Sequence, residues 1–233
     1  MKQRKRPSNR IALVVGSHIL DARKFSARLK ALKKEAKGAK IACIGVDRGL
    51  AHLYRAGWVA HFALGDWDSL TTQEQGLLDL VEHETYSPDK VESDLALGLQ
   101  FVEDIGANRI VVMGATGLHG KRPDHQLSTI LEVTEFVWRN PSIRVVEARD
   151  DEGRWIWVRG GARGFSETVK KRGLVSIFSL GSADTRVTIK GLKFKVKSQT
   201  LDFHSHGLSN EGLGIGATIS CTKGGLLLVW IGS

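Results

Sequence analysis

The sequence predicts an α/β protein, in which an N-terminal three-layer α/β/α domain with a mostly parallel sheet is followed by a C-terminal antiparallel β-sandwich. Up to residue 149, short apolar runs alternate with longer segments whose apolar residues recur at helical spacing, a pattern typical of strand–helix–strand crossover units. From Gly153 onward, short apolar runs are separated by turn residues and show no helical period, which indicates an antiparallel β domain.

The first two strand–helix units have clear boundaries. The run IALVVGS (11–17) is continuously apolar before it ends in Gly-Ser, as expected of a buried parallel strand. Asp21 is a candidate N-cap for a helix over 21–36, in which apolar residues recur at helical spacing and which Gly38 closes. KIACIGV (40–46) predicts a second strand, and GLAHLYRAG (49–57) predicts a short helix.

The same alternation continues to residue 149. TTQE (71–74) resembles a capping box and predicts a helix through Leu80. A later helix stops at Asn140-Pro141, because proline disfavours continuation of a helix. The remaining strands are expected at 62–64, 83–87, 109–115 and 143–149, and the remaining helices at 92–106 and 124–140.

The C-terminal part contains short apolar runs that predict the strands of the sandwich. These runs are RWIWVRG, LVSIFSL, TRVTIKGLKF, ATISCTKG and LLLVWI. The sequence therefore divides into a basic tail (1–10), an α/β domain (11–150) and a β-sandwich (151–233).

Charge and cysteine usage narrow the functional classes. The formal net charge is +9, but five basic residues lie in the first ten positions, and without them the body carries only +4. A mildly basic body suits a polyanionic small substrate such as a nucleotide, and no familiar nucleic-acid motif follows, so nucleic acid is not an expected partner. No apolar run reaches the length of a membrane span, and we expect no membrane partner. Cys43 and Cys221 lie in apolar stretches and read as buried free thiols of a cytoplasmic protein.

Chemistry-bearing residues follow several of the predicted parallel strands. Asp47 ends the second strand, Asp66 and Asp68 follow the third, and Asp94 begins the helix after the fourth. The segment KRPDH (121–125) opens the helix after the fifth strand. Because ligands bind beyond the carboxyl ends of parallel strands, we expect these residues to form a site at one edge of the sheet.

The paired aspartates in ALGDWDSL (63–70) point to a cation. Adjacent carboxylates repel each other, and Mg²⁺ takes oxygen ligands that it shares with substrate phosphates. An Asp-x-Asp pair can also be an ordinary turn, since Asp favours turns. In KRPDH, Arg122 could grip a phosphate at a helix N-terminus, whereas the structural alternative is that Asp124 caps the helix and His125 packs. The histidines of HSH (204–206) could bind a metal, but an exposed loop is the simpler interpretation.

The ordered set of motifs resembles the thiamine pyrophosphokinase family. That family carries Asp-Gly/Ser-Gly, Gly-Asp-x-Asp-Ser, Lys-Asp-x-Thr-Asp, Gly-x-Arg-x-Asp-His and a late Gly-Leu-Ser-Asn. The corresponding segments here are DRG (47–49), GDWDS (65–69), KVESD (90–94), GKRPDH (120–125) and GLSN (207–210). GLKF (191–194) resembles the family's Gly-Leu-Lys-Trp, so the resemblance spans roughly residues 40 to 231.

This resemblance implies an ATP-dependent diphosphotransferase that converts thiamine to thiamine diphosphate with release of AMP. The acids matching Asp66, Asp68 and Asp94 hold Mg²⁺ in that family. Residues matching Asp47, Arg122, Asp124 and His125 line the ATP side. The candidate catalytic residues are Asp47, Asp66, Asp68, Asp94, Arg122 and Asp124. Residues matching Ser209 and Asn210 lie near thiamine, which makes 11–150 the nucleotide- and metal-binding domain and 151–233 the thiamine-binding domain. The family's arrangement implies a homodimer with sites shared between subunits.

Several positions depart from the family pattern. Val91 stands where the family has the first Asp of Lys-Asp-x-Thr-Asp, and Ser93 replaces its Thr. Arg48 replaces a small residue, Phe194 replaces Trp, and Thr129 stands where Asn is common. Two alternatives therefore remain: a pyrophosphokinase for another alcohol such as 6-hydroxymethyl-dihydropterin, and a non-catalytic nucleotide-binding relative. The motifs GLKF and GLSN favour thiamine, and the sequence leaves open whether Asp94 or Asp47 is the general base.

Overall fold

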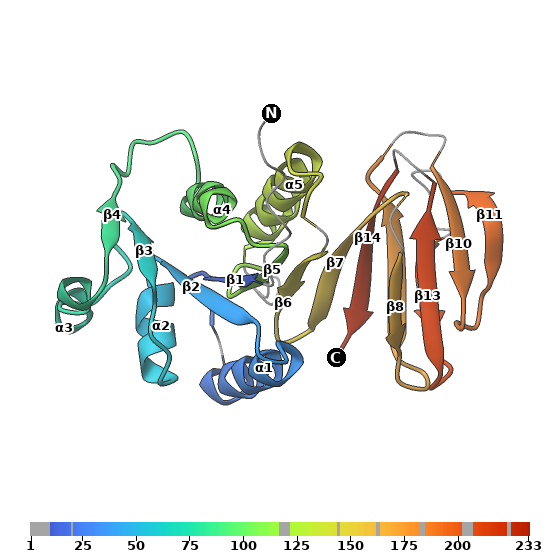
Figure 1. Ribbon diagram of the computed structural model, residues 1–233, viewed down its shortest axis with the longest axis horizontal. Coiled ribbons are helices and arrows are strands. Elements are labelled where there is room, and N and C mark those ends of the chain that lie inside the picture. Colours follow the sequence, from blue (N-terminus) through green and yellow to red (C-terminus); the bar gives the residue numbers. More distant parts are fainter. Residues whose placement is uncertain are drawn as a thin grey trace. The chain divides into compact units, whose positions relative to one another are not determined.

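The computed structural model describes residues 10–19, 21–116, 122–143, 145–161, 164–181, 185–201, 207–222 and 225–233 (Figure 1). The chain forms two compact units. The first extends to Ile143 and includes Ala148–Asp151, and the second contains Arg144–Glu147 and Glu152–Ser233. Strand β6 (Val145–Arg149) therefore contributes to both units.

The first unit is built on a parallel sheet in the order β5-β1-β2-β3-β4. Its strands are β1 (Arg10–Val15), β2 (Lys40–Val46), β3 (Phe62–Gly65), β4 (His83–Thr85) and β5 (Arg109–Met113). All carboxyl ends of these strands consequently reach the same edge of the sheet, which is the edge that the sequence predicts for the site.

Helices cover both faces of this sheet. On one face, Phe25 and Leu29 of α1 (Ala22–Glu35) are buried with Leu13 of β1, and α2 (Gly49–Arg55) packs on the same side. On the other face, α4 (Asp94–Ile105) lies so close that a Cβ on Gly98 would be 3.1 Å from Val46 Cγ2. Figure 1 shows α4 and α5 (Pro123–Arg139) on the side of the sheet opposite α1. The predicted three-layer arrangement is confirmed.

Most of the predicted helix signals are confirmed, with one correction. Asp21 caps α1 by accepting hydrogen bonds from the backbone N–H groups of Arg23 and Lys24 at 2.9 and 3.0 Å. The predicted helix through Leu80 is wrong: α3 (Thr72–Gln75) has the expected capping box but ends at Gly76, and a 3₁₀ helix, η1 (Leu78–Leu80), follows. Glycine costs about 1 kcal/mol relative to alanine inside a helix, so one short turn does not extend through it.

The second unit consists of two antiparallel sheets around one core, which confirms the C-terminal β architecture. The first consists of neighbouring strands in the order β12-β9-β14-β7, which are part of a ten-stranded sheet, and the second is a four-stranded sheet in the order β11-β10-β13-β8. Alternate residues of both sheets, such as Ile177 of β9 and Ile219 of β13, are buried together between them. The strands are β7 (Gly153–Arg159), β8 (Phe165–Thr168), β9 (Leu174–Ser179), β10 (Arg186–Lys190), β11 (Val196–Thr200), β12 (Asn210–Glu211), β13 (Gly216–Cys221) and β14 (Leu226–Gly232).

Several remaining predictions concern thiols, termini and membranes. Both cysteines are free, and burial raises the pKa of Cys43 to about 12 and that of the half-buried Cys221 to about 11. Arg10, which was predicted to belong to the tail, is the first residue of β1.

Residues 1–9 and the HSH segment lie outside the described residues. None of the helices in the described ranges combines the length and apolar character that a membrane crossing requires.

Candidate functional site

A cavity of about 320 Å³ opens at the carboxyl edge of the parallel sheet. We call it the main cavity. It lies where β1, β2 and β5 end and where helices α4 and α5 begin, so backbone and side chains from five elements meet around it. Its lining residues are Gly16, Ser17, His18, Val46, Asp47, Ser93, Asp94, Leu95, Gly114, Ala115, His125, Ser128, Thr129 and Glu132.

Two glycines allow the exits of β1 and β5 to touch at the floor of this cavity. The Gly16 N–H donates to the Met113 carbonyl at 2.8 Å, and the His18 N–H donates to the Gly114 carbonyl at 2.9 Å. A Cβ on Gly16 would lie 2.8 Å from the Gly114 carbonyl oxygen, which is too close for a side chain. Gly16 and Ser17, which end the first predicted strand, are therefore part of the site, although the sequence pattern did not assign them a role.

Asp47 lies at the centre of a group of carboxylates that we call the acidic wall, which consists of Asp47, Asp66, Asp68 and Asp94. It has a left-handed backbone with a φ of 48°, and its Oδ1 accepts a hydrogen bond from the Asp66 N–H at 3.2 Å. The carboxylate passes directly over Gly65, where a Cβ would lie 1.8 Å from Asp47 Oδ1. The glycine of GDWDS therefore makes room for the acid of DRG.

The loop GDWDS is held by its uncharged members. Trp67 is 7% exposed, has a φ of 64°, and donates from Nε1 to Thr85 Oγ1 at 2.8 Å. Ser69 Oγ accepts a hydrogen bond from the Arg48 N–H at 3.1 Å and so ties this loop to DRG. With Trp67 buried, the flanking Asp66 is half-buried and Asp68 is exposed. The Asp68 N–H donates to Asp66 Oδ1 at 3.1 Å, which keeps the two acids together.

A lysine that sequence reasoning did not single out lies among these acids. The Lys90 ammonium is 3.0 Å from Asp94 Oδ1 and 3.8 Å from Asp66 Oδ2. Asp94 begins α4, and the Ser93 hydroxyl caps that helix by accepting from the Ala96 N–H at 3.1 Å. The exit of β3 and the start of α4 thus present their carboxylates to one positive charge.

The acids perturb one another's protonation. Burial, followed by the negative charges of Asp94 and Asp66, raises the pKa of Asp47 to about 7. Burial and the neighbouring Asp66 also raise the pKa of Asp68. Burial alone would lower the pKa of Lys90, but its hydrogen bond with Asp94 and the nearby carboxylates raise it. The wall therefore carries more negative charge than Lys90 neutralises.

The donor chemistry of this wall fits a hard divalent cation such as Mg²⁺. Asp66, Asp68 and Asp94 offer carboxylate oxygens, the ligands that Mg²⁺ prefers. The Lys90 ammonium acts as a stand-in cation between two of them. Within the described ranges, there is no group of three or more His, Cys, Asp or Glu side chains that is arranged to hold a metal ion.

Arg122, Asp124 and His125 lie on a different side, at the N-terminus of α5. Arg122 donates to Asp124 in a forked arrangement, with Nε and Nη2 at 3.2 and 2.9 Å from Oδ1 and Oδ2, and its Nη2 also contacts His125 Nε2. The hydrogen bond from Arg122 lowers the pKa of Asp124 to about 2. Both Arg122 and Asp124 are exposed, at 52% and 63%, whereas His125 also lines the main cavity.

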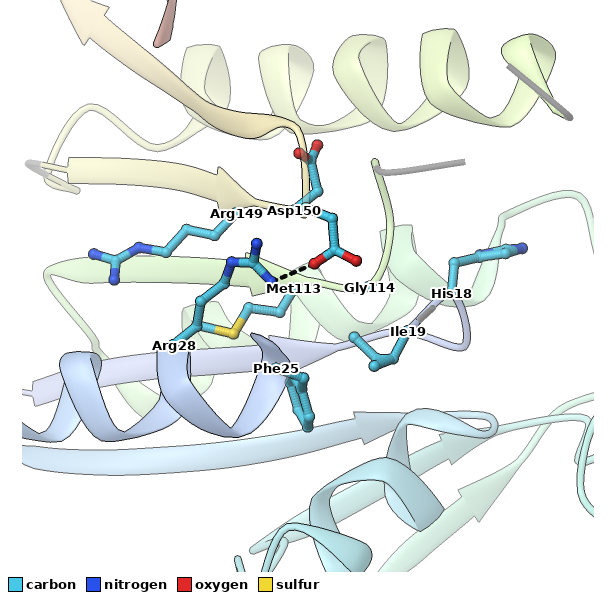
Figure 2. Close-up of a pocket in the computed structure, with 9 residues that line it drawn as sticks. His18, Ile19, Phe25, Arg28, Met113, Gly114, Arg149 and Asp150 are labelled. Atoms are coloured by element: carbon cyan, nitrogen blue, oxygen red, sulfur yellow. Dashed lines mark hydrogen bonds and ion pairs between the residues drawn. The ribbon is translucent and has the colours of Figure 1, made fainter. Parts of the chain in front are cut away.

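His18 joins this side of the main cavity. Its ring meets that of His125 edge to face, with centroids 6.0 Å apart. Burial and the adjacent His125 and Arg122 lower the pKa of His18. Figure 2 shows the imidazole of His18 pointing away from Arg28 and Asp150. A neutral imidazole here can donate one hydrogen bond to a ligand.

A second, water-sized pocket shares His18 and Gly114 with the main cavity (Figure 2). Arg28 of α1 pairs in it with Asp151 at 2.5 Å. The buried Asp150 accepts a hydrogen bond from the buried Thr116 hydroxyl at 2.7 Å. Asp150 thereby fixes the chain that leaves β5 toward GKRPDH, whose Gly120 and Lys121 lie outside the described residues. The feature of the sequence that could have pointed to Asp150 is its position directly after the sixth predicted strand.

Helices α4 and α5 are joined beside the main cavity by one carboxylate. Glu132 accepts hydrogen bonds from the hydroxyls of Ser93 at 2.7 Å and Ser128 at 2.9 Å. Ser93, which departs from the family's threonine, therefore both caps α4 and connects it to α5. This arrangement fixes the position of Asp94, the next residue.

Of the other departures, Val91 and Arg48 are not among the residues that line the main cavity, whereas Thr129 is one of them. The Val91 side chain is 98% exposed, so the missing carboxylate at this position does not disturb the pairing of Lys90 with Asp94. The Arg48 guanidinium is directed to Glu74, with Nη2 3.5 Å from Oε1. Thr129 is buried and donates to the Ala115 carbonyl at 3.1 Å.

Ser209 and Asn210 belong to the second unit, where GLSN and GLKF meet. Asn210 is 5% exposed, and its Oδ1 accepts from the backbone N–H groups of Phe194 and Glu211 at 3.0 and 2.9 Å. Its Nδ2 donates to the Phe194 carbonyl at 2.8 Å. Ser209 is exposed and has a φ of 55°. The amide of Asn210 therefore holds the two motifs together and leaves Ser209 open to a ligand.

We expect Asn210→Ala to lower the free energy of unfolding of the second unit by about 1–3 kcal/mol, because the backbone N–H and carbonyl of Phe194 lose the partner that the buried Asn210 side chain provides. Thermal unfolding of the variant measures this change. Ser209→Ala, which keeps those backbone hydrogen bonds, is the control and should unfold near the wild-type temperature. Equal melting temperatures for Asn210→Ala and the wild-type protein would show that these hydrogen bonds do not stabilise the unit.

Comparisons with known proteins identify related chains. The family model described as "Thiamin pyrophosphokinase, catalytic domain" matches residues 32–146, and the model described as "Thiamin pyrophosphokinase, vitamin B1 binding domain" matches residues 165–226. A protein named thiamine pyrophosphokinase from Bacillus subtilis is 28% identical over 189 residues, which cover 80% of this chain and 85% of the relative.

Solved structures show the same fold. The crystal structure of thiamine pyrophosphokinase from Bacillus subtilis gives a TM-score of 0.74 at 21% identity, covering 96% of this chain and 99% of that one. The enzyme from Geobacillus thermodenitrificans gives 0.71 at 22% identity, covering 96% and 98%. The one from Candida albicans gives 0.71 at 13% identity, covering 96% and 89%.

Proposed function

Because the chain belongs to the thiamine pyrophosphokinase family, we propose that it transfers the diphosphoryl group of ATP to the hydroxyl of thiamine and releases AMP. The observation that carries this proposal is the match of both family models, in order, to the two units. The first covers every residue that lines the main cavity except Gly16, Ser17 and His18, and the second covers most of the antiparallel unit. The pterin and non-catalytic alternatives are not favoured.

Two groups of residues, which adjoin the main cavity through Asp94 and His125, support different roles toward ATP. Asp66, Asp68 and Asp94 are the proposed ligands of Mg²⁺, which when bound would neutralise the polyphosphate and stabilise the charge on departing AMP. On the other side, Arg122 can bind a phosphate in forked geometry, and His125 adds a donor at the N-terminus of α5. Asp124 holds the Arg122 guanidinium in position.

The acceptor hydroxyl of thiamine needs a group that removes its proton. Asp47 and Asp94 both line the main cavity and are the two candidates for this general base. Ser209 is the proposed contact to thiamine in the second unit, with Asn210 holding its loop. Positioning and electrostatic stabilisation would then provide most of the rate enhancement.

An acceptor panel tests the proposal. The purified protein is incubated with ATP, Mg²⁺ and either thiamine or 6-hydroxymethyl-dihydropterin, and AMP is quantified. We expect AMP to form with thiamine and to match the thiamine diphosphate produced. AMP release with the pterin instead would favour the alternative acceptor, and no AMP with either would contradict catalysis of this kind.

We further propose that the enzyme is a homodimer whose sites combine acids of one subunit with Ser209 of the other. Asp66→Asn and a Ser209 variant are each expected to be poorly active. After subunit exchange, random pairing makes roughly half of the dimers mixed, and roughly a quarter of all sites should then be intact. Activity that stays at the mutant baseline, with exchange shown by an independent label, would exclude shared sites. A bulkier substitution at 209 is available if alanine is too mild.

A further inference from the structure

Lys90 occupies the point where two acids from separate elements converge. Its Nζ lies 3.0 Å from Asp94 Oδ1 and 3.8 Å from Asp66 Oδ2, and the three side chains are 14%, 17% and 15% exposed. Asp66 is further linked to the backbone N–H of Asp68 and, through its own N–H, to Asp47. In the described part of the chain, no other basic side chain forms an ion pair with these four acids.

The position of this ammonium conflicts with a metal ion on the same carboxylates. A divalent cation bound to both Asp66 and Asp94 would lie within a few ångströms of Nζ, and two cations at such distances repel strongly where water is largely excluded. Lysine has a flexible stem and three rotatable donors, so its head can move while its backbone stays in place. The displaced ammonium needs a new anionic partner, and a polyphosphate in the main cavity provides one.

We propose that Lys90 is the counter-cation of the metal-free acids, that the metal displaces it, and that it then binds the polyphosphate of the incoming nucleotide. This inference rests on the proposed function. Lys90 consequently weakens binding of free metal and strengthens binding of the metal–nucleotide complex. The metal therefore enters together with the polyphosphate rather than before it, because only then does each positive charge keep a negative partner.

The test compares Lys90→Met with the wild-type protein in two binding measurements. The first is a titration of the nucleotide-free protein with Mn²⁺, followed by the electron paramagnetic resonance signal of the free ion. The second is calorimetry at saturating Mg²⁺ with α,β-methylene-ATP, whose bridging carbon blocks cleavage at the bond where AMP would leave. We expect Lys90→Met to bind Mn²⁺ at least about tenfold more tightly, since it removes one repelling unit charge, and to bind the analogue at least about tenfold more weakly.

Tighter binding of Mn²⁺ together with weaker binding of the analogue distinguishes displacement of Lys90 from structural damage, because damage to the site would weaken both. Lys90→Arg keeps the charge and should lie close to the wild-type protein in the Mn²⁺ titration. If Lys90→Met unfolds, Lys90→Gln replaces it. Mn²⁺ binding that is unchanged or weaker in the neutral variant, or undiminished binding of the analogue, would overturn the proposal. Formation of thiamine diphosphate by the wild-type protein is assayed separately, so failure of the proposed function is recognised independently of these binding results.

Discussion

Replacing Asp66 by asparagine is expected to reduce kcat/KM for thiamine diphosphate formation by at least about a hundredfold, because a metal ion can supply several kcal/mol of transition-state stabilisation. The substitution removes a charge and keeps the shape. Asparagine can still accept the hydrogen bond that Asp66 Oδ1 receives from the Asp68 N–H at 3.1 Å. We therefore expect the fold to remain intact, and steady-state kinetics together with thermal unfolding measure both effects.

Asp89→Asn provides the matched control for this experiment. Asp89 is exposed and precedes Lys90, but it is not one of the two acids that pair with the Lys90 ammonium, which are Asp66 and Asp94. Its variant should retain near wild-type turnover, whereas Asp68→Asn should resemble Asp66→Asn. Near-normal turnover of either site variant would contradict the assignment of these acids as metal ligands.

Gly65→Ala is expected to damage both stability and activity. Gly65 has a φ of 152°, a conformation that costs a residue with a side chain about 1–3 kcal/mol. The new methyl group would also lie 1.8 Å from Asp47 Oδ1 and would force this carboxylate out of the main cavity. Because a misplacement near 1 Å can cost about a hundredfold in rate, we expect turnover to fall by at least about tenfold.

Gly76→Ala is the control for the glycine substitution. Gly76 has a φ of −61°, and a Cβ there would meet its nearest neighbour at 3.6 Å, an ordinary contact. Alanine at such a position commonly stabilises a protein by about 0.4–1 kcal/mol. The free energy of unfolding measured by chemical denaturation should therefore fall for Gly65→Ala and rise for Gly76→Ala. A Gly65→Ala protein as stable and active as Gly76→Ala would show that the crossing of Asp47 over Gly65 does not matter.

The fold was predictable where local pattern and tertiary structure agree. Continuous apolar runs such as 11–15 and 110–113 became buried parts of parallel strands, and Asp21 and Gly106 mark helix ends as capping rules predict. Strands β8, β11 and β12 were not predicted, because they are short or largely exposed and lack a continuous apolar run. The pairing of β12 with β9 depends on residues more than 30 positions apart, which local patterns do not reveal.

The edge of the sheet that carries the site was also predictable, but its internal contacts were not. Asp47, Asp94 and His125 line one cavity because parallel strands end at a common edge. Lys90 and Asp150 act through partners brought close by tertiary packing, so the motif that contains Lys90 and the position of Asp150 after a predicted strand do not reveal these contacts. The role of Trp67 as an anchor likewise depends on Thr85, which belongs to a neighbouring strand.

The position of ATP cleavage tests the central claim most directly. The protein is incubated with thiamine and Mg²⁺ and with ATP labelled either at the α- or at the γ-phosphorus, and the products are separated. Transfer of a diphosphoryl group predicts that the γ-label appears in thiamine diphosphate and the α-label in AMP, in equal amounts. Label from the γ-position in thiamine monophosphate, with the α-label in ADP, would contradict the account.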